Sequence, residues 1–245
     1  MNRQINGIVA VFTLAVIGIA LASICSASPP DNAAVQQTVQ NPAGERLIKA
    51  IRERNASLVE AALKDGADIE GSGGDYGMNP LMQASADGSV DMVKILLRHG
   101  ANINAEARMF GFMPLERAAW KGHEDVVKYL IAHGADVNAH VSKHGTSAYL
   151  VYEGISPRNL TPLTSAAYCG SIPIIDMLLK AGAKIDGQDG SSYTPLMWAA
   201  SIGNRDTVIA LLKRGADRTV KSDTGKTARD MAIQHENMET AETLK

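Results

Sequence analysis

The chain has 245 residues, enough for one large domain or two small ones; 45% of them are apolar, but only 4% are aromatic. Alanine, leucine, isoleucine, valine and methionine must therefore form most of the core, which favours closely packed short helices over a sheet sandwich. Lysine and arginine number 24 against 26 aspartate and glutamate residues, and no basic block occurs, so the charge pattern gives no support to nucleic-acid binding.

Residues 1–27 are typical of a signal peptide. Arg3 is their only charged residue, and a run of apolar and small residues extends from Ile8 to Ala22. This run suits a signal peptide and is short for a bilayer span, which needs about 20 residues. We expect cleavage after Ala27, and hence a periplasmic or secreted protein. The alternative is an uncleaved N-terminal anchor, which would be the chain's only contact with a membrane.

Residues 28–43 are polar and contain three prolines, which predicts a flexible linker. After the linker, residues 44–245 contain an internal repeat. Four Pro-Leu pairs are spaced by 34, 48 and 33 residues, and the Gly-Ala pairs that follow them keep the same spacings. The prolines are Pro80, Pro114, Pro162 and Pro195, and the glycines are Gly100, Gly134, Gly182 and Gly215. Because two independent markers move in step, the pattern indicates a repeat array.

These motifs resemble the ankyrin repeat, whose signature is T-P-L-H-x-A with a period of about 33 residues. The resemblance implies an all-α fold, an ankyrin-repeat solenoid of about six helix-turn-helix units with β-hairpin fingers. The expected units are residues 44–70, 75–105, 109–139, 157–187, 190–220 and 223–245, with an insert at residues 140–156. The last unit carries Glu236, Glu239, Glu242 and Lys245, a polar outer face typical of a capping repeat.

The chain departs from the signature at its histidine. The residues assigned to that position are Met82, Glu116, Thr164, Met197 and Arg229. In the family this histidine helps to hydrogen-bond neighbouring repeats, so the resemblance implies weaker polar bonding between repeats in this chain.

Most aromatic residues fall where the resemblance places a binding surface. Six precede a first helix, in the finger segments, and two lie at the helix position that faces the concave side in the family. The predicted partner-binding residues are Tyr76, Phe110, Phe112, Trp120, Tyr149, Tyr152, Tyr168 and Tyr193. Packing between adjacent repeats explains Trp120 and Tyr168 equally well, whereas Tyr129 and Trp198 are assigned to the core.

The insert, residues 140–156, carries two of these tyrosines and a Leu-Val pair, which favours a binding loop. A neutral insertion is the alternative, since long surface loops cost little.

The sequence therefore predicts an exported, bacterial-type protein-binding module that is not an enzyme. No catalytic, cofactor-binding or metal-binding residue is assigned, no cofactor is expected, and the chain is expected to be a monomer with a protein partner. His140 and His144 have ligand-like spacing but no third ligand nearby. The leading interpretation is an inhibitor or immunity protein for an envelope enzyme. The alternative is a periplasmic scaffold or stress-protection factor, and a remote one is a hydrolase carried on the solenoid.

Overall fold

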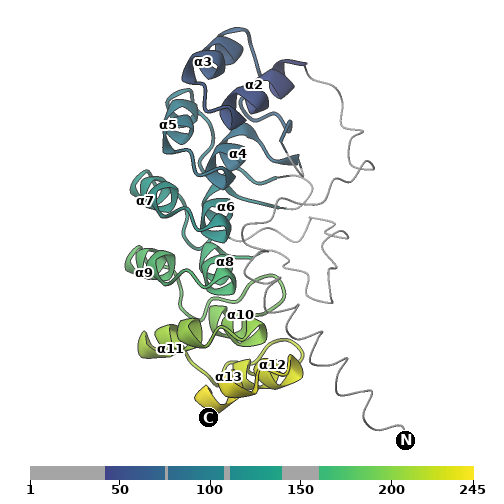
Figure 1. The fold of residues 1–245 in the computed structure, drawn as a ribbon, viewed down its shortest axis with the longest axis vertical. Coiled ribbons are helices and arrows are strands. Elements are labelled where there is room, and N and C mark those ends of the chain that lie inside the picture. The colour runs from purple at the N-terminus through teal and green to yellow at the C-terminus, as the bar shows by residue number, and fades with distance from the viewer. Residues whose placement is uncertain (1–41, 75–76, 108–110, 140–159) are drawn as a thin grey trace, which may run out of the picture. The chain divides into compact units, whose positions relative to one another are not determined.

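The computed structural model describes residues 42–74, 77–107, 111–139 and 160–245. Within these ranges the chain forms twelve helices in six consecutive pairs (Figure 1). The first helices are α2 (Pro42–Arg52), α4 (Pro80–Ala86), α6 (Pro114–Lys121), α8 (Pro162–Cys169), α10 (Pro195–Ile202) and α12 (Ala228–Gln234). The second helices are α3 (Ala56–Lys64), α5 (Val90–Arg98), α7 (Glu124–Ala132), α9 (Ile172–Lys180), α11 (Arg205–Lys213) and α13 (Met238–Thr243).

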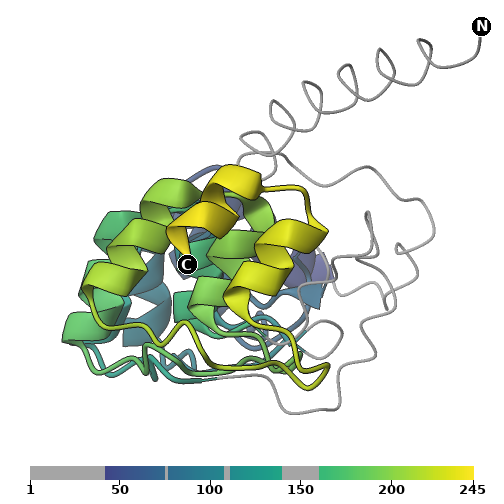
Figure 2. The same ribbon diagram turned by 90° about the horizontal axis from the view of Figure 1, so that it is seen from below.

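The helix pairs stack in chain order, so that the first helices form one layer and the second helices another. Each first helix packs against the next first helix, from α2 to α12, and Figure 2, seen along the stack, shows the two layers side by side. The predicted all-α solenoid of about six repeats is confirmed. The predicted signal peptide and insert lie outside the described residues, and so does the predicted linker except for Pro42 and Ala43, which belong to the first turn of α2, so the linker was drawn two residues too long. None of the described helices is long and apolar enough to cross a membrane.

The repeat motifs begin and end the helices. Proline opens α4, α6, α8 and α10 in the first turn, where its missing N–H costs nothing. The side chains of Thr161 and Thr194 accept the backbone N–H three residues on, a cap that contributes about 1 kcal/mol. Helix α8 ends at Cys169 and is capped by Gly170, whose φ of 75° is a left-handed conformation that glycine adopts without strain. In α8 and α10 the residues next to the helix therefore mark both where it begins and where it ends.

Helix α12 begins with a capping box. The Thr227 hydroxyl accepts the Asp230 backbone N–H, and the Asp230 carboxylate accepts the Thr227 backbone N–H at 2.9 Å. Since Thr227 is the cap, Asp230 holds the position of the signature histidine. The assignment of Arg229 to that position is therefore wrong by one residue.

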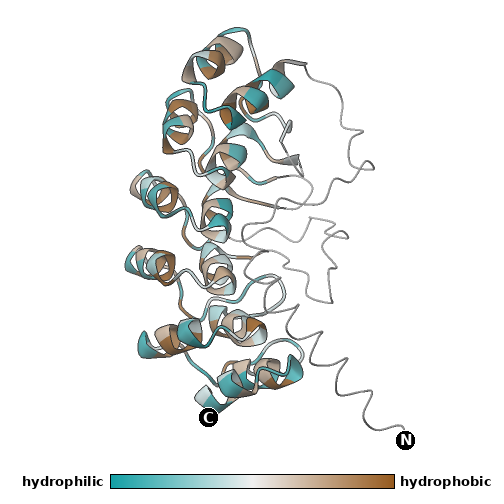
Figure 3. Cartoon of the chain, viewed as in Figure 1, coloured by the Kyte–Doolittle hydropathy of each residue, from teal (hydrophilic) through white to brown (hydrophobic). Residues whose placement is uncertain are grey.

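The main hydrophobic core runs between the two layers along the stack, and a second, small cluster consists of Met78, Met82, Ala105 and Ala107. Figure 3 shows that most helices carry one hydrophobic and one hydrophilic side. Ala118, Ala166 and Ala199 are fully buried and let neighbouring first helices pack closely. Leu163, in the central helix α8, is 1% exposed. Because each repeat packs mainly on its neighbours, stability depends on every interface along the stack.

The segments between repeats were expected to be β-hairpin fingers, but the described ranges contain no strand. Two backbone hydrogen bonds, at 2.8–3.0 Å from N to O, close each of three tips. One joins the two sides of the tip, in the pairs Ala107–Phe112, Asp189–Tyr193 and Ser222–Lys226, and the other is a turn bond from Gly111, Ser192 or Gly225 back to the first residue of the pair. A strand pair needs a series of such bonds, and these short tips are too tightly turned to form one.

A polar ladder joins successive repeats at the base of the fingers. In each step a side-chain oxygen accepts the backbone N–H of the next repeat, at N···O distances between 2.6 and 2.9 Å. The acceptor and donor pairs are Glu70–Asn102, Asn104–Asp136, Asn138–Lys184 and Asp186–Asp217. Asn138 also donates its Nδ2 to the Gly182 carbonyl at 3.1 Å. The repeats on either side of the insert are thus bonded like the others, and the ladder supplies polar bonds that the missing signature histidines do not.

The C-terminal repeat has the polar outer face that the sequence predicts. Glu236, Glu239, Glu242 and Lys245 are all exposed. Met238 is also 57% exposed and Ile233 38%, so this repeat exposes two large apolar side chains as well.

Candidate functional site

A row of aromatic side chains crosses α6, α8 and α10 in the layer of first helices. The rings of Trp120 and Tyr168 are stacked, with centroids 4.7 Å apart and planes 15° apart. Tyr168 and Tyr193 each meet Trp198 edge to face, at 5.5 and 5.4 Å between centroids. We call these four residues the aromatic row. Trp198 is 1% exposed and the other three are partly exposed, so the row has a buried anchor and an accessible surface.

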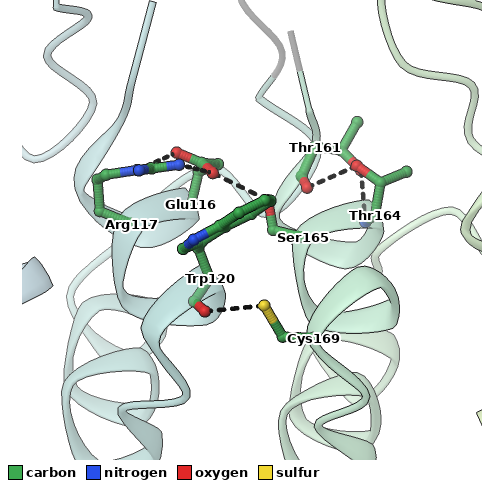
Figure 4. Close-up of polar contacts among 7 residues, drawn as sticks. All are labelled: Glu116, Arg117, Trp120, Thr161, Thr164, Ser165 and Cys169. Carbon is green, nitrogen blue, oxygen red and sulfur yellow. Dashed lines mark hydrogen bonds and ion pairs between the residues drawn. The ribbon is translucent and has the colours of Figure 1, made fainter. Parts of the chain in front are cut away.

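Arg117 extends this row toward the N-terminal repeats. Its guanidinium lies 3.7 Å from the centroid of the Phe112 ring and 5.5 Å from that of Trp120. Glu116 accepts two hydrogen bonds from Arg117, at 2.7 and 2.6 Å (Figure 4). Charge-assisted pairs of this geometry and cation–π contacts both hold a guanidinium in place. Arg117 is therefore positioned before any partner arrives.

The carboxylate of Glu116 also links two repeats. Ser165, on the neighbouring helix α8, donates its hydroxyl to Glu116 Oε1 at 2.9 Å. Figure 4 shows this bond beside the Trp120 ring and, below it, the Cys169 sulfur 2.9 Å from the Trp120 carbonyl oxygen. Glu116 is 3% exposed, so its charge is satisfied almost entirely by protein groups. The signature histidine position thus still carries a bond between repeats, here through a carboxylate.

Asp189 anchors the other end of the row. Its Oδ2 accepts the Trp198 indole N–H at 2.5 Å, and its Oδ1 accepts the backbone N–H groups of Ser191 and Tyr193 at 2.8 and 3.0 Å. Burial nevertheless raises the pKa of Asp189 to about 6, because the desolvation of the charge outweighs these bonds. The finger before α10 is therefore held to Trp198 by a carboxylate that titrates near neutral pH.

The raised pKa of Asp189 predicts a pH-dependent stability. The folded state binds the Asp189 proton more tightly than an unfolded aspartate of pKa 3.8 does, so this residue favours folding at low pH. The contribution is lost as the pH rises through about 6. Between about pH 4 and pH 7.5 we expect it to lower the free energy of unfolding by about 2 kcal/mol.

The measurement compares urea unfolding of the wild type and the Asp189→Asn variant across that pH range. The asparagine variant should lack this part of the pH slope, because it cannot titrate. Parallel pH profiles for the two proteins would contradict the assignment.

Half of the predicted partner-binding residues can be located. Phe112, Trp120, Tyr168 and Tyr193 form, with Arg117 and Trp198, one array along three repeats. The predicted residues outside the described part of the chain are Tyr76, Phe110, Tyr149 and Tyr152. The rings of Trp120 and Tyr168 pack between adjacent repeats, as one of the two interpretations predicted, and both side chains stay partly exposed. Their role in binding stays a prediction.

Sequence reasoning missed the charged groups of this array. Arg117 lies three residues before Trp120 on the same helix, a spacing that places both on one face and that could have revealed it. Trp198 was assigned to the core and is indeed buried, yet it contacts two members of the row. Nothing in the sequence around Asp189 indicates its bond to Trp198. Among the described residues, no group of three or more His, Cys, Asp or Glu side chains is placed to hold a metal ion.

Comparison with known proteins identifies the repeat. Residues 47–141 and 166–245 match the family model described as ankyrin repeats (3 copies), and residues 115–179 match the one described as ankyrin repeats (many copies).

Curated relatives share only part of their length with the chain. Ankyrin repeat and SAM domain-containing protein 6 of Rattus norvegicus is 38% identical over 74 residues, 30% of this chain and 8% of that protein. Protein phosphatase 1 regulatory subunit 27 of Homo sapiens is 35% identical over 77 residues, 31% of this chain and 50% of that protein. The probable 26S proteasome regulatory subunit p28 of Saccharomyces cerevisiae is 31% identical over 97 residues, 37% of this chain and 42% of that protein. With family models covering more than half of the sequence and six helix pairs stacked in order, the chain belongs to the ankyrin-repeat family.

Proposed function

We propose that this chain is exported and binds one protein partner without catalysis, as an inhibitor or immunity protein for an envelope enzyme. Ankyrin repeats generally bind proteins, and one relative is named as a regulatory subunit of protein phosphatase 1. The signal-peptide pattern of residues 1–27 supports export. The observation that carries the binding proposal is the aromatic row with Arg117, laid across three rigid repeats.

The row has the physical properties of a binding surface. Tryptophan, tyrosine and arginine are the residue types that dominate the energy of protein interfaces. Trp120 and Tyr168 are held by stacking, and Arg117 by Glu116 and Phe112, so these side chains have little conformational entropy left to lose on binding. A surface ordered in advance in this way gives tight binding for a modest contact area.

The test is affinity capture from an extract of the source organism, with the full chain carrying a C-terminal tag. The baits are the wild type, Trp120→Ala, Tyr129→Ala and a chain lacking residues 141–156. Tyr129 is the matched control because it is a partly buried aromatic on the second helix α7. We expect one partner, captured by the wild type and the control and weakened about tenfold or more by Trp120→Ala.

Four outcomes separate the parts of the proposal. Equal capture by the Trp120→Ala bait would contradict the aromatic row as the binding surface. The chain lacking residues 141–156 should keep its helix content in circular dichroism, since the Asn138 bonds close the stack beside the insert, and should lose the partner.

The inhibitor role requires that an equimolar amount of the chain abolish the partner's enzymatic activity, and unchanged activity would overturn it. Export requires an envelope or secreted location, and the expected cleavage after Ala27 gives a new N-terminus at Ser28.

A further inference from the structure

Within the described ranges, three polar groups of the aromatic row have no hydrogen-bond partner. They are the indole N–H of Trp120 and the hydroxyls of Tyr168 and Tyr193, which we call the ring tips. The Trp198 indole N–H differs, because it donates to Asp189. Figure 4 draws the Trp120 ring nitrogen without a bond to any other residue shown there. The row thus carries three polar groups that no part of the described fold uses.

The ring tips reach the surface. Among the described residues, the buried side-chain atoms without a partner are Thr207 Oγ1 and Arg229 Nε, so none of the ring tips is buried. The Tyr168 ring packs against Trp120 and Trp198, and burial raises the pKa of its hydroxyl. This hydroxyl therefore has less water around it than that of an exposed tyrosine, and a ligand that bonds it displaces little solvent.

Helices α8 and α10 contribute no charged side chain to this surface, because their sequences are PLTSAAYC and PLMWAASI. The charges at the two ends of the row already have partners, since Arg117 donates to Glu116 and Asp189 accepts three hydrogen bonds. A carboxylate placed over α8 or α10 would lose water without meeting an opposite charge on these helices. The chemistry of the row therefore favours an uncharged ligand.

The Trp120 indole N–H determines what such a ligand must offer. An indole N–H can only donate, and in an uncharged segment every residue carries one acceptor, its backbone carbonyl. An α-helix uses most of its carbonyls in internal bonds, whereas a polyproline II segment makes no internal bonds. The rings follow one another at 4.7–5.5 Å between centroids, so about five residues of such a segment, at about 3.1 Å each, span the row. An extended segment thus fits the row in length and in hydrogen bonding.

We infer that the aromatic row binds an extended, uncharged and proline-containing segment of the protein partner, whose backbone carbonyls accept hydrogen bonds from Trp120 and Tyr168. This inference rests on the proposed function, because it names the ligand of the same surface. Proline rings pack against aromatic side chains, and a segment that is already extended loses little conformational entropy on binding. Tyr193, in the finger before α10, gives the segment a third contact.

Packing alone is the other explanation of the row. Tryptophan and tyrosine often bury an apolar ring while the polar tip stays in water. If the ring tips have only this role, removing one leaves the affinity for a ligand unchanged. If they bind carbonyls, removing one weakens binding while the ring and the fold remain.

The experiment uses the immobilised full chain to select from a random 12-residue peptide library displayed on phage. The selected peptides are synthesised, and their affinity is measured by fluorescence anisotropy at about 50 and 300 mM salt. We expect peptides that are enriched in proline and depleted of charged residues. Because such peptides form no ion pairs with the row, their affinity should change by less than about twofold between the two salt concentrations.

Phenylalanine variants test the two hydrogen bonds. Tyr168→Phe removes the hydroxyl and keeps the ring, and Trp120→Phe removes the indole N–H and keeps an aromatic side chain. Each should weaken the binding of the selected peptides about three- to tenfold, the loss expected for one hydrogen bond. Tyr129→Phe is the matched control, because Tyr129 lies on the second helix α7 and stacks on His133, outside the row. Its affinity for the peptides should equal that of the wild type.

Each result decides the inference. Selection of peptides that lack proline, of peptides enriched in aspartate and glutamate, or of none, overturns it. Unchanged affinity in both Tyr168→Phe and Trp120→Phe also overturns it, and circular dichroism of each variant excludes unfolding as the cause of weaker binding. If Trp120→Ala loses the natural partner while the selected peptides lack proline, the extended ligand is wrong and the proposed binding surface stands. If Trp120→Ala retains the natural partner, the proposed surface fails and the inference fails with it.

Discussion

Replacing Glu116 with alanine is expected to lower the free energy of unfolding by about 3–5 kcal/mol. Glu116 is 3% exposed and accepts two bonds from Arg117, whose side chain is 12% exposed. Without the carboxylate, the Arg117 guanidinium stays mostly buried and has no counter-charge. The bond from Ser165, which joins α6 to α8, is lost as well. Urea unfolding followed by circular dichroism measures the change.

Two further variants identify the cause of that loss. Glu116→Gln keeps the volume and one acceptor oxygen, so its loss should be smaller than that of the alanine variant. Replacing Glu116 with leucine and Arg117 with methionine together removes both charges, and the double variant should be more stable than Glu116→Ala. If the double variant is as unstable as the single one, the loss comes from packing and not from the unpaired charge.

Local sequence was sufficient to predict the repeat because each repeat encodes its own boundaries. The prolines at the helix starts and the glycines after the second helices gave the order and spacing of the four central helix pairs, out of six in the described residues. The same periodicity placed Trp120 and Tyr168 at one position in successive repeats, from which their proximity follows. The fingers were predicted less well, because a family pattern implied hairpins, whereas two backbone bonds around a tight turn close each of the three tips and no strand pair follows in the described residues.

The charged groups at the site could not be predicted in the same way. Ser165 and Glu116 are 49 residues apart, and their bond depends on the rotation of α8 against α6, which no local pattern specifies. Asp189 and Trp198 are close in sequence, but the bond between them depends on how the finger folds back over α10. A repeat pattern thus predicts which positions meet, whereas the side chains that depart from the consensus determine what chemistry occurs there.

Replacing Leu163 with alanine is expected to lower the free energy of unfolding by about 2–5 kcal/mol. Leu163 is 1% exposed in α8, near the middle of the stack, and its truncation leaves a cavity between repeats. Because each repeat contacts mainly its neighbours, a weak central interface separates the array into an N-terminal and a C-terminal half. Hydrogen exchange measured by mass spectrometry should show early loss of protection in α8 and its neighbours, with α2 to α5 protected longer.

The matched control is Leu244→Ala, since Leu244 is 3% exposed but lies at the C-terminal repeat. The same number of atoms is removed there, yet only one interface is weakened, so increased exchange should be confined to α12 and α13. In that case the position of the substituted residue in the stack, and not its burial alone, determines how many helices lose protection from exchange. Identical exchange patterns in the two variants would show that the repeats unfold as one cooperative unit, and the nearest-neighbour account of this fold would be wrong.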